Sequence, residues 1–184
     1  MAFLFFLVGT IGFIILFGII IYNRFVRLRF TVRSSWSDID VLLKKRYNLV
    51  PNLVETVKGY ASHERAVFEN VTEARAKAMQ ASSPAEKAQA ENIFRETLKS
   101  LFAVAEAYPD LKASIQFSQL QTQLQQVEDS IEYARRYYNA VVRDYNTMTE
   151  AFPSNLIAGQ FGFTKEEFFE LEAPAEREPV QVKF

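Results

Sequence analysis

The chain has 184 residues, a net charge of −1 at neutral pH and no cysteine. This length suits one domain with an appendage, the balanced charge excludes the basic footprint of a nucleic-acid binder, and the lack of cysteine excludes disulfides and thiolate metal ligands. The six glycines and six prolines lie mostly near the two ends. Since these residues interrupt helices, the long middle that they leave predicts an all-α fold.

Residues 2 to 22 form an apolar stretch without Asp, Glu, Lys, Arg or His. Because a helix rises about 1.5 Å per residue, about 20 residues cross a hydrocarbon core of about 30 Å. A cleaved signal peptide would have basic residues before a shorter apolar run and a small-residue cleavage site, and the stretch has none of these features. We therefore predict a retained, single-pass transmembrane anchor over residues 1–23.

Four arginines follow the anchor directly: Arg24, Arg27, Arg29 and Arg33. Positive charge beside a span tends to stay on the cytoplasmic side of the cell membrane, so the bulk of the chain is expected in the cytoplasm, with the N-terminus outside. The same side chains are candidate contacts for anionic lipid headgroups, although setting the topology is their simpler role.

An apolar stripe then runs from Trp36 towards Gln80 with steps of three and four, the period of one helix face. Its members are Trp36, Ile39, Leu43, Tyr47, Val50, Val54, Val57, Ala61, Phe68 and Val71. Pro51 removes one backbone hydrogen bond inside this pattern. Because the stripe keeps its phase past the proline, we predict a kink at Pro51 rather than a break.

The next helix begins at Ser83. Its side chain can accept from the amide of Glu86, the Glu86 carboxylate can reach back, and Pro84 suits the first helical position. This helix is expected to run to Tyr108-Pro109, which reads as a tight helix-to-helix turn.

The last long helix has the most regular apolar pattern, a heptad-like seam. It consists of Phe117, Leu120, Leu124, Val127, Ile131, Ala134, Tyr138, Val141, Tyr145 and Met148. Such a seam predicts coiled-coil-like packing against a partner helix, either within the chain or in another copy. Three helices joined by short turns predict that the transmembrane helix continues into an elongated antiparallel bundle over residues 24–172.

After Pro153 the pattern predicts a compact loop and then a short helix capped by Thr164 and Glu167. The aromatic residues here are Phe161, Phe163, Phe168 and Phe169. We expect them to dock on the end of the bundle, with insertion into a membrane surface or a partner's groove as the alternative. Residues 173–184 are rich in proline and charge and predict a flexible tail.

Candidate chemistry is sparse in this sequence. His63 is the single histidine, and Val67 stands where a zinc-protease motif would place a second one. The chain has no phosphate-cradling or acyl-transfer motif. We therefore predict no catalytic residue, metal or cofactor. An enzyme would need a site assembled by the fold, tested by loss of activity on replacing His63 or Glu64.

Polar residues that lie beside the seams are candidates for fixing helix register or forming an interface, with a ligand site as the alternative. Together with the neighbouring aromatic residues they are Trp36, Asp40, Asn48, Asn52, Glu55, Lys58, Tyr138, Asn139, Tyr145 and Asn146.

The sequence resembles the LemA family. The segments that carry the resemblance are Trp36-x-x-Ile39-Asp40, the run from Leu42 to Glu64, the run from Glu128 to Asn146, Phe152-Pro153, Phe161-Gly162-Phe163 and the closing Pro179 to Phe184. The resemblance implies a bacterial, membrane-anchored helical bundle in a family that includes proteins of magnetosome membranes. It implies no established activity and no catalytic residues.

These observations predict a non-enzymatic, membrane-anchored scaffold that self-associates or docks other membrane proteins through its helical faces. The alternative is an oligomer that organises or shapes the membrane through the arginines after the span. Membrane lipids are expected partners of either.

Overall fold

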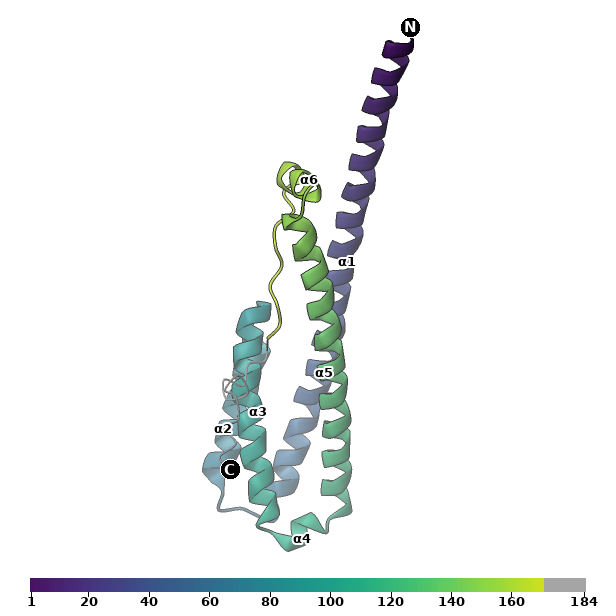
Figure 1. Cartoon of the computed structure of the whole chain (residues 1–184). Coiled ribbons are helices and arrows are strands. Elements are labelled where there is room, and N and C mark those ends of the chain that lie inside the picture. Colours follow the sequence, from purple (N-terminus) through teal and green to yellow (C-terminus); the bar gives the residue numbers. More distant parts are fainter. Residues whose placement is uncertain (171–184) are drawn as a thin grey trace, which may run out of the picture. The chain divides into compact units, whose positions relative to one another are not determined.

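The computed structural model describes residues 1–170, and it is helical apart from turns and a C-terminal extended segment (Figure 1). The helices are α1 (Ala2–Lys58), α2 (Arg65–Gln80), α3 (Pro84–Glu106), α4 (Pro109–Lys112), α5 (Ile115–Glu150) and α6 (Ser154–Phe161). Residues 1–170 contain no strand, so the all-α prediction is confirmed. The predicted tail, residues 173–184, and the closing Pro179 to Phe184 lie outside the described residues.

The chain forms two compact units. The first, here the anchor unit, contains Met1–Asp38 and Arg136–Glu167. The second, here the bundle unit, contains Ile39–Arg135 and, of the described residues that follow Glu167, residues 168–170. Helices α1 and α5 contribute to both units. The division into anchor, bundle domain and tail at residues 23 and 172 stays a prediction.

In the bundle unit, α2 and α3 run antiparallel to each other beside the last part of α1 and the first part of α5 (Figure 1). The short helix α4 lies in the connection predicted at Tyr108-Pro109. The buried apolar core comes from all four long segments, with Leu43, Leu53, Phe94, Leu101 and Ile131 nearly inaccessible to solvent. Each helix thus turns one apolar face inward, as amphipathic bundle helices do.

The stripe that was expected to continue as one helix to Gln80 is interrupted, and that prediction was wrong. Helix α1 ends at Lys58, a turn follows at Gly59, and α2 starts at Arg65. Glycine lowers helix propensity by about 1 kcal/mol, and the reversal folds α2 back so that its own apolar face is buried. Phe68 and Val71 are therefore buried, but on an antiparallel helix rather than further along α1.

Helix α1 continues through Pro51 without a break, and the structure shows how the carbonyl that the proline leaves unpaired is satisfied. A helical residue at position 51 would donate its amide to the carbonyl of Tyr47, and proline has no N–H to give. The Nε of Arg75, on α2, donates to the Tyr47 carbonyl at 2.7 Å instead. The break is thereby excluded, and the bend at Pro51 stays a prediction.

The start of α3 confirms the predicted cap. The Ser83 Oγ accepts from the Glu86 amide at 3.2 Å, and the Glu86 carboxylate accepts from the Ser83 amide at 3.3 Å. Pro84 occupies the first helical position. Hydrogen bonds from the Ser82 and Ser83 amides hold the pKa of Glu86 below its usual value. The local sequence therefore suffices to define this helix start.

The seam of α5 is packed inside the chain. Eight of its members are buried in the single chain, namely Phe117, Leu120, Leu124, Val127, Ile131, Tyr138, Val141 and Tyr145, and Ala134 and Met148 are half-buried. The partner left open by the sequence is thus internal, and this seam is not a free surface for another copy.

The predicted order of elements after Pro153 was wrong. The short helix α6 comes first, directly after the proline, and ends at Phe161. The next residue, Gly162, caps it with a φ of 69°, the left-handed conformation that glycine adopts most readily. Residues 163–170 are not helical, so Thr164 caps no helix. The backbone of Glu166 instead bonds to a side chain of α5, which competes with helix formation.

Candidate functional site

A buried charge cluster lies at the centre of the bundle unit. The guanidinium of Arg46, on α1, is ion-paired with the Glu91 carboxylate on α3, and its Nη1 donates to Glu128 Oε1 on α5 at 2.6 Å. Arg46 and Glu91 are 1% and 2% exposed. The Arg46 carbon Cζ also lies 5.2 Å from the centre of the Phe94 ring. The Arg46 Nε has no hydrogen-bond partner within residues 1–170, so its charge depends on the two carboxylates.

Two further polar groups border this cluster. The Tyr47 hydroxyl donates to Glu91 Oε1, and burial raises the pKa of Tyr47 to about 12, which keeps the donor protonated. The Lys87 ammonium donates to the Ala78 carbonyl, in the last turn of α2, at 3.3 Å. Burial lowers the pKa of Lys87, and the nearby Asp40 carboxylate opposes that shift. The cluster thus ties all four long segments of the unit together.

The sequence does indicate this cluster, but only when charged residues are counted together with the apolar residues of each helical series. Arg46 occupies a core position in the α1 series Ile39, Leu43, Arg46, Val50, Leu53 and Val57, and Glu91 does so in the α3 series Lys87, Glu91, Phe94, Leu98, Leu101 and Ala105. Opposite charges at core positions of two neighbouring helices predict a buried pair. We did not identify either residue from the sequence.

In the anchor unit, an aromatic cluster joins the end of the apolar stretch to the segment after α6. The Phe163 ring stacks on Phe25 with centroids 4.7 Å apart and lies 5.7 Å from Tyr22, while Phe161 meets Tyr22 edge-on at 4.8 Å. Tyr145 on α5 contacts Phe25 at 5.9 Å. The Phe161 and Phe163 rings thus both contact α1, but Phe163 is buried whereas Phe161 is 57% exposed.

The segment after Phe163 runs as an extended strap along α5. The Asn146 amide donates to the Glu166 carbonyl and accepts from the Glu166 amide, both at 2.9 Å. The Tyr138 hydroxyl donates to the Glu167 carbonyl at 2.8 Å, and burial, with the nearby Glu166, raises the pKa of Tyr138 to about 12. Asn146 and Tyr138, which were candidates for fixing the register of two helices, therefore bond to the backbone of the extended strap.

The four arginines predicted to contact headgroups are placed differently from one another. Arg24, Arg27 and Arg33 are exposed, whereas the Arg29 guanidinium lies over the Phe163 ring, 5.2 Å from its centre. Arg29 thus contacts the aromatic cluster, and the other three present their charge outward.

The candidate register residues beside Pro51 lie on the outer face of α1. Asn48, Asn52 and Glu55 are exposed, and with Val41 and Lys45 they form a stripe spaced by four and three residues. We call these five residues the outer stripe. Asp40 is half-exposed and pairs with Lys44 at 2.7 Å. The outer stripe points away from the internal seams.

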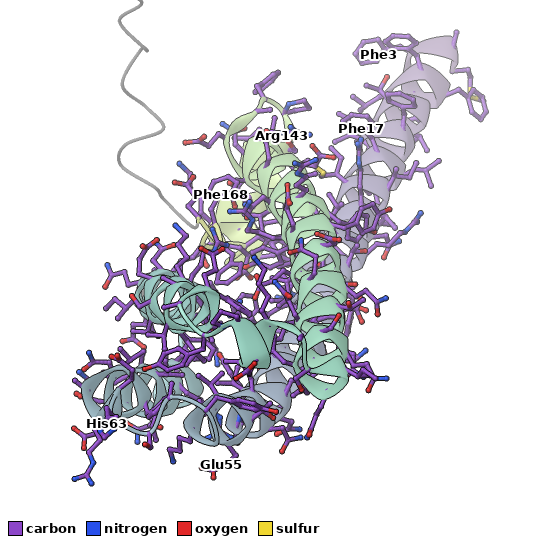
Figure 2. The ribbon with its side chains drawn as sticks, turned by 90° about the horizontal axis from the view of Figure 1, so that it is seen from below. Phe3, Phe17, Glu55, His63, Arg143 and Phe168 are labelled. Carbon is purple, nitrogen blue, oxygen red and sulfur yellow. The ribbon has the colours of Figure 1, made fainter. Side chains whose placement is uncertain are left out.

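The remaining candidates are placed as follows. Trp36 lies half-buried with its ring 5.4 Å from that of Tyr138, Tyr145 is buried, and Asn139 is half-buried. His63 lies exposed in the turn between α1 and α2, and Figure 2 shows it pointing outward, as does Glu55.

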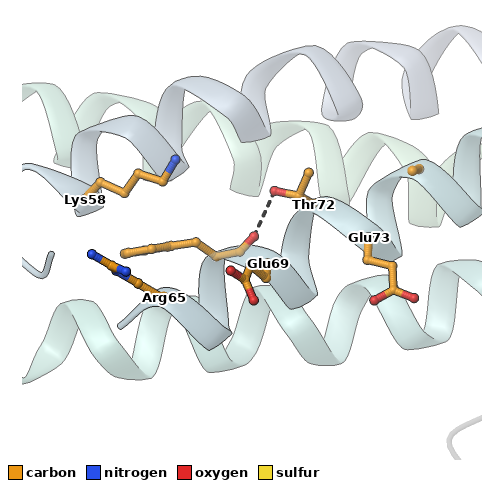
Figure 3. A pocket seen from close by; sticks show the side chains of 7 residues that line it. Lys58, Arg65, Glu69, Thr72 and Glu73 are labelled. Carbon is orange, nitrogen blue, oxygen red and sulfur yellow. Dashed lines mark hydrogen bonds between the residues drawn. The ribbon is translucent and has the colours of Figure 1, made fainter. Parts of the chain in front are cut away.

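A surface depression of about 520 Å³ adjoins that turn. Lys58 and Arg65 lie at one end of it and Glu73 at the other (Figure 3). The Lys58 Nζ lies 5.9 Å from the centre of the Phe68 ring, which also lines the depression. Lys58 is paired with Glu55 at 2.7 Å and Glu73 with Lys77 at 2.7 Å. The depression therefore presents surface charges of both signs, which suit contacts with polar side chains.

Together these features define an all-α bundle protein whose first helix has an exposed apolar stretch of membrane-spanning length. Among the described helices, α1 alone is long and apolar enough to cross a membrane. The chain belongs to the LemA family, whose family model matches residues 35–184. The predicted resemblance is thereby confirmed.

Among curated proteins, the chain is 27% identical to magnetosome protein MamQ 2 of Paramagnetospirillum magneticum and 26% identical to magnetosome protein MamQ of Magnetospirillum gryphiswaldense, in each case over 86% of this chain and 68% of the relative. It is 29% identical to protein LemA of Metamycoplasma hominis, over 85% of this chain and 72% of the relative. Family, relatives and the apolar helix support association with a membrane.

Proposed function

We propose that this protein is a non-enzymatic, membrane-anchored scaffold that docks a helix of a partner protein on the outer stripe of its bundle unit. Residues 1–23 serve as the single-pass anchor, and the arginines that follow keep the bundle in the cytoplasm. The observation that carries the proposal is the composition and spacing of the outer stripe on a helix whose inner face is already fully used.

Two asparagines in the middle of an exposed helix face are unfavourable for the helix itself. Asparagine is a poorer helix former than lysine or glutamate by up to about 0.7 kcal/mol, and Asn48 and Asn52 are exposed. Within residues 1–170 neither side chain forms a hydrogen bond that offsets this cost, and a local conflict with stability is a common sign of function. Two amides one turn apart, with Val41 seven residues before Asn48 on the same face, provide hydrogen bonds and an apolar contact at the spacing by which a second helix packs.

Site-specific photocross-linking in intact cells tests this proposal. A photoreactive residue at position 52 is expected to give one defined adduct, and the same residue at Glu96, on the exposed face of α3, is the control. Val41→Lys combined with Asn48→Lys should lower the yield of the adduct about tenfold, the effect of about 1.4 kcal/mol of lost affinity, without changing helicity.

Identification of the adduct distinguishes its possible sources. A heterologous protein that is lost in the double variant supports docking of a partner, and a second copy of this chain assigns the outer stripe to self-association. Equal yields from positions 52 and 96, or a yield that the double variant does not change, would contradict the proposal.

A second candidate is the membrane-organising oligomer, which is favoured by the exposed Leu156 and Phe161 of α6 and by the exposed Arg24, Arg27 and Arg33. Reconstitution into vesicles of phosphatidylcholine with and without phosphatidylserine tests it. Vesicles that change shape only with the anionic lipid, and no longer do so after replacement of the three arginines by glutamine, would support this function; unchanged vesicles would remove it.

A further inference from the structure

Helix α6 packs against the part of α1 that forms the last third of the apolar stretch. The Ile157 Cδ1 lies 3.8 Å from where a Cβ would stand on Gly18, and Phe161 contacts Tyr22. An apolar groove of about 480 Å³ lies between the two helices, lined by Ile14, Ile15, Gly18, Ile19, Tyr22, Ile157 and Phe161. A Cβ at Gly18 would therefore stand in ordinary van der Waals contact with Ile157, so the two helices pack closely at this position.

These contacts set the depth of α6 if the stretch spans a bilayer. Ile14 and Tyr22 are eight residues apart, so the groove covers about 12 Å of helix axis, on the hydrocarbon side of Arg24, the first charged residue after the stretch. A segment in contact with these residues lies at the same depth as they do. Helix α6 is then surrounded by acyl chains in the leaflet where the span ends.

The side chains of α6 fit such surroundings. The segment from Ser154 to Phe161 has no ionisable residue, and Leu156, Phe161 and the preceding Phe152 are 63%, 57% and 80% exposed. Large apolar side chains gathered at one place on a water-exposed surface are unfavourable, whereas contact with acyl chains stabilises them by about 25 cal/mol per Å².

The backbone of the connection from α5 is also suited to a place without water, where each unpaired polar group costs several kcal/mol. The Ala151 amide bonds to the Thr147 carbonyl at 2.9 Å, and the Asn155 amide bonds to the Ala151 carbonyl at 2.8 Å. The Ser154 hydroxyl lies 2.7 Å from the Met148 carbonyl and donates to the end of α5. The turn from α5 to α6 therefore satisfies these groups internally.

We propose that α6 is a second membrane-embedded element, inserted into the leaflet in which the α1 span ends, and that a phospholipid acyl chain fills the groove between α1 and α6. This inference goes beyond docking of a protein partner and shares with it only the anchor. It makes the anchor unit a two-point contact with the bilayer, so that rotation and tilt of α1 are restricted by α6.

Spin labelling of the full chain tests the proposal directly, because the chain has no native cysteine and each introduced thiol gives a unique label. Nitroxides are attached in Leu156→Cys and Phe152→Cys, with Ile11→Cys as the control inside the span and Tyr137→Cys as the control in water. Tyr137 is 50% exposed on α5. Its neighbour Tyr138 contacts Trp36, and Trp36 lies about 21 Å further along α1 than Tyr22. Position 137 is therefore well outside the span. The proteins are reconstituted in phosphatidylcholine vesicles.

The measurement is the collision rate of each label with molecular oxygen, which concentrates in hydrocarbon, relative to that with a water-soluble nickel chelate. Labels at positions 156 and 152 are expected to resemble the label at 11 and to show nickel accessibility several-fold below that at 137. Labels at 156 and 152 that resemble 137 overturn the insertion of α6 while leaving the anchor and the outer stripe untouched. A water-exposed label at 11 would overturn the anchor itself, and the insertion with it.

Discussion

Glu91→Leu lowers the free energy of unfolding by about 3 to 5 kcal/mol, the usual cost of removing one partner from a buried ion pair. The Arg46 side chain is 2% exposed and loses its more buried carboxylate partner, while the Glu128 side chain, 31% exposed, compensates only in part. The Tyr47 hydroxyl loses its Glu91 acceptor at the same time and keeps only the Ala78 carbonyl, 3.3 Å away. Guanidinium titration of the full chain in mild detergent, followed by circular dichroism, measures the loss.

Two variants provide the controls for this prediction. Glu96→Leu removes a carboxylate from the same helix, but Glu96 is paired with the exposed Lys99. Exposed ion pairs contribute only about 0 to 1 kcal/mol to the free energy of unfolding. Arg46→Met combined with Glu91→Leu removes both buried charges and should recover much of the stability, because apolar replacements of a buried pair are often neutral or stabilising. If Glu91→Leu costs no more than Glu96→Leu, the buried cluster does not have the energetic role assigned to it.

Arg75→Met has the second largest expected effect, a loss of about 1 to 3 kcal/mol in the free energy of unfolding. The Tyr47 carbonyl would lose the donor that lies 2.7 Å away, and an unpaired buried acceptor costs about that amount. Pro51 prevents the helix from supplying another donor, because its nitrogen carries no hydrogen.

The dependence on Pro51 makes this second prediction specific. In a Pro51→Ala background the alanine amide can bond to the Tyr47 carbonyl, so Arg75→Met should then cost about 1 kcal/mol less. Pro51→Ala on its own should stabilise the chain, since a proline inside a helix costs about 3 kcal/mol. A double-mutant cycle by thermal or guanidinium unfolding measures this coupling. Additive effects would mean that Arg75 acts independently of the proline.

Features that depend on residues close together in the chain could be predicted from the sequence. The Ser83 cap forms because serine, proline and glutamate occupy the positions at which each satisfies a helix terminus. The apolar stretch before Arg24 is helical and exposed, as its composition indicates. The α5 seam follows from period alone, which specifies the buried face of a helix without specifying its partner.

Features that depend on which helices meet required the tertiary structure. The apolar stripe keeps its phase through Gly59, so periodicity could not distinguish one helix to Gln80 from two antiparallel helices. After Pro153, the two hydrogen bonds between the Asn146 side chain and the Glu166 backbone override a local helix signal. That signal could not reveal these bonds, because Asn146 lies 20 residues before Glu166.

The candidate polar residues illustrate the same division. Asn48, Asn52 and Glu55 were recognised as polar positions near a seam, yet the sequence does not say which way they point. The sequence by itself determined the apolar N-terminal helix, the helical class and the inward face of α5, since these follow from local chemistry and period. Only the tertiary structure decided that Arg46 faces Glu91 and that Arg75 donates to the carbonyl that Pro51 leaves unpaired, because each pairing exists only after separate helices have packed together.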